Sequence, residues 1–495
     1  MRSAIDHAKY LKKPVYLTLY DYTQCFDSLW LDDCLLSLHK LGIQTELLNV
    51  IKNLNETSNI KVKTPVGLTE EFQVKSIVQQ GSVLGGTLCT ASTAEIADES
   101  FEGGCQIGTC SIRSLIYVDD IAAANRAPSE TYLSHDGITW FSDKKRLALN
   151  APKCMILCVN LKKSDVVPRL KIKGYPLAEK EVVTYLGDQF NKAGNNKHLI
   201  EERVKKGQCC IVNSMSLCSD VTMGLFCLPT LLILYRGLFL QVVLYNAQAW
   251  SNLSKQDLSN LQTVQLKYIK RMFHAPSSTS NSLTYLETGL LPIEQEIHIR
   301  QLTYLHHIVG LDEDDPVLMA YTEQIKYEYA PNWGNNVKTI RSNYGIKQTD
   351  EEVKSMSKRR WKRIIKGTIT AHTLNKLSEE ARKQKRASNI LPYNEFKTQK
   401  YISNFPTPMA RKLFHARLGI LDIKGLRTYK YGDDLKCRLC DGGDENVDHI
   451  VNTCPSILRT NLIQNIYTNN EEEMKEVARR CLEFCNKVEE PDLSS

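Results

Sequence analysis

Apolar and polar positions in the first 190 residues follow two different periods, which predicts a mixture of strands and helices there. Residues 14–20 combine β-branched, aromatic and apolar types in alternation and stop at Asp21, so they predict a strand. Two short strands are expected within 110–124, joined at Asp119–Asp120, and another at 155–160. Hairpins are expected from 59–65 with 70–78, and from 170–177 with 181–187. Helices are predicted over 3–12, 29–43, 46–54, 84–98 and 132–150.

Beyond His198 the pattern is almost wholly helical, so the N-terminal third is predicted as mixed α+β and the remainder as mainly α. The most apolar stretch, 225–245, is interrupted by Pro229, Arg236, Gly237 and Gln241. Such residues disfavour a membrane span and favour a buried helix pair.

Length and charge narrow the possible partners. The chain has 495 residues, 42% of them apolar, and a net charge of +7. The length allows about three globular domains. The charge is uneven, because residues 358–400 contain 13 basic and 3 acidic side chains, whereas 471–495 contain 8 acidic and 4 basic ones. The basic block indicates a polyanionic partner, with a solvated helix face as the alternative.

Cysteine usage indicates reduced thiols and one metal site. The chain has 16 cysteines and opens without the apolar segment of a secretory signal, so we expect an intracellular protein. Cys437, Cys440, His449 and Cys454 are spaced C-x2-C-x8-H-x4-C. Three thiolates and one imidazole complete a tetrahedral Zn²⁺ site, which is typical of a structural rather than a catalytic zinc.

Two adjacent carboxylates, Asp119 and Asp120, interrupt the apolar stretch RSLIYVDDIAAA. Burying such a pair is costly unless positive charge compensates it. Asp21 ends another predicted strand, so the three carboxylates meet at one sheet edge if the strands are neighbours. Hard cations such as Mg²⁺ bind carboxylates of this kind, and a pair of bound Mg²⁺ ions supports nucleotidyl transfer. The alternative is an ordinary solvated turn.

The order of further motifs resembles the palm of a reverse transcriptase, specifically of non-LTR retrotransposons. LYDYTQCFDSLW, QQGSVLGG, YVDD, LALNAPK and YLGDQF follow one another over residues 15–190. The resemblance implies an α+β right-hand polymerase palm with its fingers largely missing, then an all-α thumb and connector and a small CCHC zinc knuckle. The implied segments are an N-terminally truncated palm at 1–192, a thumb at 193–275, a connector at 276–430, the knuckle at 431–460 and an acidic helical tail at 461–495.

The same resemblance implies a role for each motif residue. Asp21 and Asp119 would hold two catalytic Mg²⁺ ions, with Asp120 as an auxiliary carboxylate. The implied substrate contacts are Phe26 against the sugar, Gln80 and Gly81 at the nucleotide and template, and Lys153 near the departing pyrophosphate. Tyr185 and Leu186 would hold the primer end. The alternatives are a core phenylalanine, a strand-to-helix turn and a surface lysine.

The basic block is expected to bind nucleic acid through Lys358, Arg359, Arg360, Lys362, Arg363 and Lys366. Trp361 within it is predicted to be buried with Ile364 and Ile365, rather than to stack on a base.

Together these features predict an RNA-directed DNA polymerase that uses Mg²⁺ and one structural Zn²⁺. Its expected partners are an RNA template, a DNA primer or target and deoxynucleoside triphosphates, without a membrane, and its expected location is the nucleus and cytoplasm. The alternative is a non-catalytic nucleic-acid-binding remnant, or a co-opted protein that uses the knuckle and the basic helices.

Overall fold

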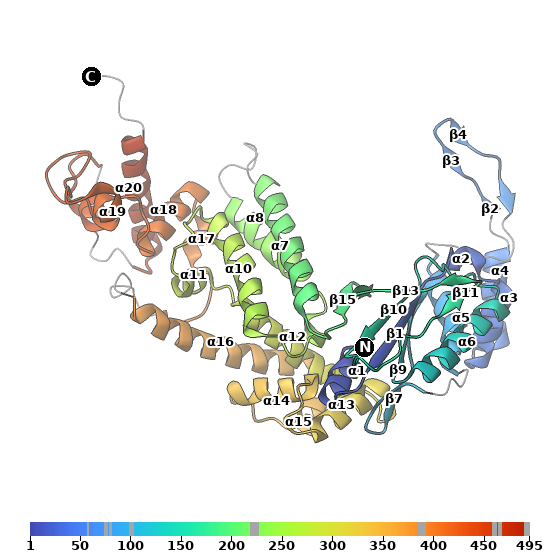
Figure 1. The fold of residues 1–495 in the computed structure, drawn as a ribbon. Helices are drawn as coiled ribbons and strands as arrows, with labels where there is room; N and C mark the ends of the chain where they lie inside the picture. The colour runs from blue at the N-terminus through green and yellow to red at the C-terminus, as the bar shows by residue number, and fades with distance from the viewer. Residues whose placement is uncertain are drawn as a thin grey trace. The chain divides into compact units, whose positions relative to one another are not determined.

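The computed structural model describes residues 1–56, 59–73, 78, 82–98, 103–217, 227–384, 393–457, 463 and 468–489. The chain folds into two compact units, which we describe separately (Figure 1). The first comprises Met1–Leu199, Ala249–Asn252 and Gly310–Lys338, and the second comprises Ile200–Gln248, Leu253–Val309 and Thr339–Ser495.

The first unit is built on a five-stranded sheet of order β13-β10-β1-β9-β8. Its strands are β1 (Val15–Tyr20), β8 (Ser114–Tyr117), β9 (Asp120–Asn125), β10 (Met155–Val159) and β13 (Ala178–Glu179). β1 pairs antiparallel with both β9 and β10, and all six of its residues are buried. A central strand covered on both faces explains why β1, with the sequence VYLTLY, contains only apolar, aromatic and β-branched residues.

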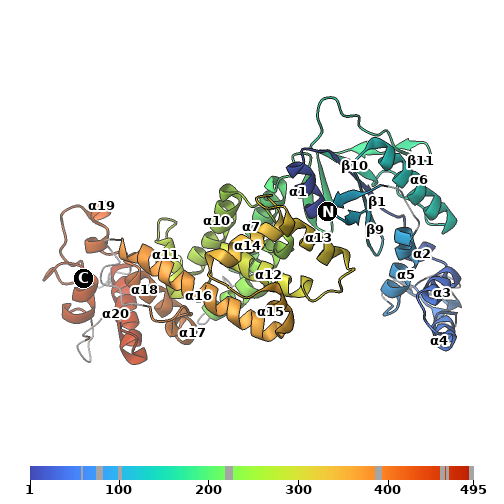
Figure 2. The ribbon, with the colours of Figure 1, turned by 90° about the horizontal axis from the view of Figure 1, so that it is seen from below.

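Helices cover both faces of this sheet. They are α1 (Arg2–Tyr10), α2 (Cys25–Ser28), α3 (Leu31–Lys40), α4 (Thr45–Glu56), α5 (Gly85–Asp98) and α6 (Pro128–Lys144). Tyr16 and Tyr20 of β1 lie in a core shared with α2, α3, α5 and α6, whereas Leu17 and Leu19 lie in a core shared with α1. This division follows the two-residue period of a strand. Helices α2 to α5 form a group beside the sheet (Figure 2).

Two predictions for this unit are wrong in detail. The helix expected at 132–150 begins at Pro128 and ends at Lys144. Arg146 has a left-handed φ of 59°, and Leu149 forms a bridge with Tyr22 instead of continuing the helix. The segments 170–177 and 181–187 do not pair with each other. The first is a hairpin by itself, β11 (Lys171–Ile172) with β12 (Tyr175–Pro176), and the second supplies β14 (Val182–Tyr185), which pairs with β15 (Asp188–Asn191).

Three further segments complete the first unit. β2 (Asn59–Ile60) pairs with β5 (Phe72–Gln73), and β3 (Lys63–Thr64) pairs with β4 (Gly67–Leu68) beyond them. The expected hairpin of 59–65 with 70–78 therefore forms within the described residues, which leave out 74–77. β6 (Cys105–Ile107) and β7 (Cys110–Ile112) form another hairpin, and α13 (Pro316–Lys326) packs against it.

The second unit is helical. Its helices are α7 (Lys197–Leu217), α8 (Cys227–Leu234), α9 (Leu240–Val243), α10 (Lys255–Met272), α11 (Asn281–Thr288), α12 (Ile293–Ile308), α14 (Trp333–Asn343), α15 (Asp350–Ser355), α16 (Lys358–Arg382), α17 (Lys400–Asn404), α18 (Thr407–Arg417), α19 (Thr428–Tyr431) and α20 (Glu471–Glu489). The first residues of α7 and of α14 belong to the first unit. Instead of the expected helix pair, α8 and α9 are joined by a π-helical turn, Tyr235–Phe239, into one run. Within the described residues, no helix is long and apolar enough to cross a bilayer.

A buried ion pair ties the helices of the second unit together. Arg417 of α18 donates to Glu287 of α11 at 2.7 Å, and their side chains are 2% and 0% exposed. The hydroxyls of Tyr393 and Tyr401 donate to the same carboxylate at 2.6 and 2.8 Å. A buried carboxylate needs this many donors, because each unsatisfied oxygen would lose its hydration without replacement.

The turn of the β6–β7 hairpin offers a test of how the 310–338 segment is held. Gly108 has a φ of +56°, and a Cβ there would lie 1.9 Å from Oε2 of Glu323 on α13. Glu323 accepts hydrogen bonds from Thr109 at 3.0 Å and from Lys326 at 2.7 Å, so moving its carboxylate loses contacts. We expect Gly108→Ala to lower the free energy of unfolding by about 2–3 kcal/mol, from backbone strain and one lost hydrogen bond.

Urea denaturation measures this effect, and Gly174→Ala is the matched control. Gly174 has a φ of +88° and nothing within 4 Å of an added Cβ, so its substitution introduces backbone strain alone. Equal destabilisation by the two variants would contradict the contact between Gly108 and Glu323.

Candidate active site and Cys-His metal centre

Three carboxylates converge at one edge of the central sheet. Tyr20 at the end of β1 pairs with Ile121, and Asp120 at the start of β9 pairs with Tyr117. Continuing this register by one residue places Asp21 opposite Asp120. Burial raises the pKa of Asp120, and the negative charges of Asp119 and Asp21 raise it further. The carboxylates are therefore close enough to repel one another.

The turn that presents Asp119 is strained. Val118 and Asp119 form a two-residue connection between β8 and β9, and Val118 has a φ of 57°. A β-branched residue rarely adopts a left-handed conformation. The carbonyl oxygen of Val118 accepts a hydrogen bond of 2.8 Å from the hydroxyl of Thr93 on α5. Strain of this kind persists where surrounding contacts over-determine the backbone, and it is common at functional sites.

Lys153 brings positive charge to this edge. Its Nζ lies 3.3 Å from Oδ2 of Asp21, although the lysine side chain is 65% exposed. The loop that carries it lies along the end of β1, because Asn150 N donates to Asp21 O and Thr23 N donates to Ala148 O, both at 2.8 Å. Lys153 is thus an exposed lysine that lies beside Asp21. Its role at a pyrophosphate stays a prediction.

The donors at this edge are of the chemical type that binds Mg²⁺. Oδ2 of Asp21 is buried, and its charged neighbour is Nζ of Lys153 at 3.3 Å, which forms no aligned hydrogen bond with it. The exposed ammonium of Lys153 compensates only part of the charge of three carboxylates. Carboxylate oxygens are the ligands that Mg²⁺ takes in proteins, usually with water and phosphate oxygens.

Phe26 lies on α2, directly beyond the carboxylate edge. Its side chain is half-buried and packs against the core that contains Tyr20 and Leu88. The neighbouring Cys25 has its Sγ 3.7 Å from Sγ of Cys89 on α5. A packing role and a sugar contact are both compatible with this position, so the sugar contact stays a prediction. Gln80 and Gly81 lie outside the described residues.

Tyr185 and Leu186 lie at the turn of the β14–β15 hairpin. Leu186 and Gly187 have φ values of 48° and 79°, which is the backbone of a two-residue type I′ turn. The Tyr185 hydroxyl donates to Leu115 O of β8 at 2.9 Å, and burial together with the nearby Asp120 raises its pKa to about 12. This hydrogen bond joins the β14–β15 hairpin to the hairpin that carries Asp119. A contact of Tyr185 and Leu186 with a primer stays a prediction.

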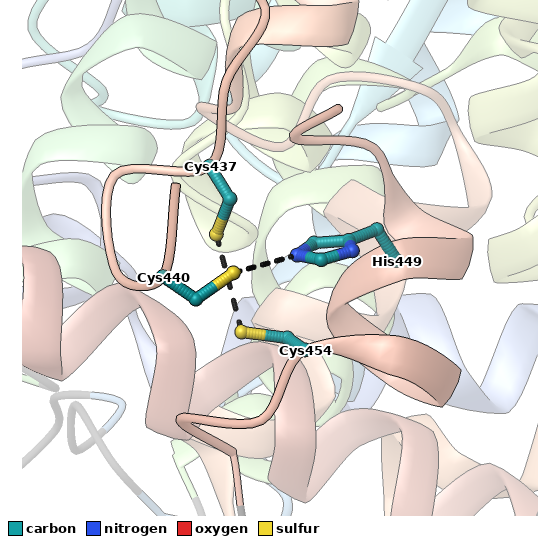
Figure 3. Close-up of side chains that lie close together, drawn as sticks. All are labelled: Cys437, Cys440, His449 and Cys454. Carbon is teal, nitrogen blue, oxygen red and sulfur yellow. Dashed lines mark hydrogen bonds between the residues drawn. The ribbon is translucent and has the colours of Figure 1, made fainter. Parts of the chain in front are cut away.

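The four predicted zinc ligands come together in the second unit (Figure 3). All four ligand atoms of Cys437, Cys440, His449 and Cys454 lie within 4.8 Å of one another. Sγ of Cys437 lies 3.9 Å from Sγ of Cys454, and Sγ of Cys440 lies 3.3 Å from Nε2 of His449. Tetrahedral Zn–S bonds of about 2.3 Å separate two sulfurs by roughly 3.8 Å, so this cluster fits Zn²⁺.

The surroundings of His449 support the same assignment. Its Nδ1 lies 2.9 Å from Oγ1 of Thr453, which leaves Nε2 to face the thiols. Metal-bound histidines usually have such a partner on the other ring nitrogen. A Cβ at Gly443 would lie 3.0 Å from Nδ1, so a side chain there would press against the imidazole ring. Burial raises the pKa of Cys454 to about 12, and a bound cation would stabilise its thiolate instead.

The cluster is anchored on both sides. Glu445 is fully buried and accepts hydrogen bonds from the backbone N–H groups of Arg438 and Lys424, and from the Arg438 guanidinium at 2.6 Å. Arg480 of α20 donates to Val451 O at 2.6 Å. The cluster therefore organises the packing of the last helix.

The six basic residues predicted to bind nucleic acid lie on the first turns of α16, and all are exposed: Lys358, Arg359, Arg360, Lys362, Arg363 and Lys366. Trp361 is fully buried, and its Nε1 donates to Leu302 O of α12 at 2.7 Å. The prediction of a buried tryptophan beneath a basic surface is confirmed.

Comparisons with known proteins agree with the motifs. Residues 1–190 match the family described as reverse transcriptase (RNA-dependent DNA polymerase). The chain is 24% identical over 272 residues to the RNA-directed DNA polymerase from mobile element jockey of Drosophila funebris, a match that covers 52% of this chain and 28% of that protein. The chain thus matches less than a third of the length of this relative.

Solved telomerases are also similar in part. Apo telomerase from Candida tropicalis without its C-terminal domain has 16% identity and a TM-score of 0.30, over 39% of this chain and 37% of that one. Telomerase from Candida albicans in complex with a fragment of telomeric RNA has 14% identity and a TM-score of 0.32, over 74% and 51%.

We expect the purified chain to contain one Zn²⁺, and Cys440→Ser to lose most of it because the thiolate set is incomplete. Zinc content by mass spectrometry measures this, together with hydrogen exchange in α20, which should become faster in the variant. Cys209→Ser, at an exposed cysteine of α7, is the control and should keep its zinc. Equal zinc in the two variants would refute the Cys-His centre.

Proposed function

We propose that this chain, whose residues 1–190 belong to the reverse transcriptase family, synthesises DNA on an RNA template. The observation that carries the proposal is the convergence of Asp21, Asp119 and Asp120 at one sheet edge beside Lys153. The match to RNA-directed DNA polymerases supports the choice of template and product.

In this proposal Asp21 and Asp119 hold two Mg²⁺ ions, with Asp120 in support. The ions, when bound, lower the pKa of a primer 3′-hydroxyl and stabilise the charge of the pyrophosphate that leaves. Asp21 directly follows β1 and Asp119 directly precedes β9, so the backbone pairing of these two strands brings the two residues to the same edge. Lys153 leaves Asp21 and moves toward the pyrophosphate, where its ammonium stabilises negative charge.

Several residues would position the substrates. Phe26 limits the space at the sugar 2′ position, so that deoxynucleotides are favoured over ribonucleotides. Gln80 and Gly81 contact the nucleotide and the template. Tyr185 and Leu186 hold the primer end close to Asp119, consistent with the hydrogen bond from Tyr185 to β8.

The second unit would bind nucleic acid without sequence preference. The six exposed basic residues at the start of α16 form contacts with phosphates, which are electrostatic and weaken with salt. Zn²⁺ at the Cys-His centre stabilises the fold of the knuckle and its packing against α20.

A second candidate function is nucleic-acid binding without catalysis. It is favoured by the same exposed basic residues of α16 and by the Cys-His cluster, neither of which requires a polymerase site. Such a protein would bind RNA or DNA but would not extend a primer.

Asp119→Asn separates the two functions. The amide keeps the size of the side chain but removes a metal-ligand charge, so primer extension on an RNA template with Mg²⁺ should fall by at least about 100-fold, more than the loss of an outer-shell partner of a metal ligand. Binding of the same primer–template should change little, because the basic residues of α16 and the proposed primer contacts of Tyr185 and Leu186 are kept.

The control is Asp32→Asn, at an aspartate of α3 whose side chain is 78% exposed. It should extend primers like the wild type. Full activity in Asp119→Asn would refute the assignment of the metal ligand, and binding without any extension by the wild type would support the second candidate.

A further inference from the structure

Thr93 is a buried polar residue that connects helix α5 to the carboxylate edge. It lies in the middle of α5, and its side chain is fully buried. Its hydroxyl lies 2.8 Å from Val118 O, 3.0 Å from Cys89 O and 3.4 Å from Thr90 O. The two longer contacts are to its own helix, whereas the shortest reaches another element. A hydroxyl has a single proton to donate, and its shortest contact is with Val118 O.

The carbonyl that Thr93 binds controls the direction of Asp119. The Val118 carbonyl belongs to the peptide unit that ends at the amide nitrogen of Asp119. Because a peptide unit is planar, a fixed carbonyl also fixes the plane from which the Asp119 side chain departs. Val118 has a φ of +57°, which its branched side chain disfavours, so an unconstrained turn would relax to another conformation.

Helix α5 is itself held firmly. Glu95, two residues after Thr93, accepts a hydrogen bond from Ser37 of α3 at 2.6 Å and forms an ion pair with the largely buried Lys145 at 3.0 Å. Cys89, one turn before Thr93, contacts Cys25 of α2 at 3.7 Å between sulfurs. Helix α5 therefore contacts the β8–β9 turn, which carries Asp119, helix α2, which carries Phe26, and the C-terminal end of α6.

We propose that Thr93 is a positioning residue of the polymerase site, and that its hydroxyl holds the Val118–Asp119 turn in the conformation that binds metal. The inference rests on the proposed function for its effect on catalysis, whereas its effect on metal binding can be measured separately. Without the hydroxyl, the turn samples other conformations, and Asp119 spends less time in the geometry that Mg²⁺ requires.

Thr93→Val tests the proposal, because it keeps the branched shape and removes the donor. The Mg²⁺ concentration for half-maximal primer extension should rise about 10-fold, as expected for the loss of an outer-shell partner of a metal ligand. The KM for the primer–template should be unchanged. Thr93→Ser keeps the donor and should restore the wild-type Mg²⁺ dependence.

The control is Thr131→Val. Thr131 is a buried threonine of α6 whose hydroxyl donates to Ala127 O of its own helix at 2.9 Å, so it shares the packing but not the contact with the turn. If Thr93→Val and Thr131→Val have the same Mg²⁺ dependence, the proposal is overturned. Should Thr93→Val fail to fold, Thr93→Ala provides the same comparison with a smaller side chain.

Titration of the full chain with Mn²⁺, followed by electron paramagnetic resonance, separates this inference from the proposed function. Weaker Mn²⁺ binding by Thr93→Val than by Thr131→Val supports the positioning role even if the wild type extends no primer. Absence of primer extension by the wild type counts against the proposed function alone. Equal Mn²⁺ affinity in the two variants overturns the role of Thr93.

Discussion

The main electrostatic constraint on the first unit is that three carboxylates, which repel one another, are held at one edge of its sheet. Asp21 and Asp120 are brought together by the pairing of β1 with β9, which itself is stabilised by apolar burial on both faces of the sheet. Lys153 offsets part of the charge from an exposed position, so its attraction is weakened by water. The fold therefore uses hydrophobic burial to concentrate charge that a divalent cation can neutralise.

Geometry at this edge is maintained by contacts that are distant in the sequence. Thr93 fixes the carbonyl of the strained residue Val118, and Tyr185 joins a separate hairpin to β8. Each contact comes from an element with its own packing, so the turn is held from two directions. Such support matters for the proposed metal site because partners that orient a metal ligand contribute to metal affinity.

Features determined by local sequence were predicted well, and features determined by distant contacts were not. Alternation identified β1, and spacing alone identified the Cys-His cluster, because both depend on neighbours along the chain. The end of α6 was misplaced because the left-handed Arg146 is stabilised by its surroundings rather than by its residue type. The pairing of 170–177 failed because register depends on partner strands. Nothing in the sequence of α5 indicates that the hydroxyl of Thr93 faces a turn 25 residues away.

The chain treats buried charge differently in its two units, and this difference bears on function. In the second unit, Glu287 receives a guanidinium and two hydroxyls from fixed side chains, so its charge is fully compensated within the protein. At the carboxylate edge, the buried Oδ2 of Asp21 has only the exposed ammonium of Lys153 at 3.3 Å, without an aligned hydrogen bond. Glu287 therefore needs no ligand from outside the protein. The carboxylate of Asp21, in contrast, is incompletely compensated by protein groups, which is what a site for an exchangeable cation requires. This contrast is the physical reason to propose the edge of the first unit, rather than the ion pair of the second, as the reactive centre.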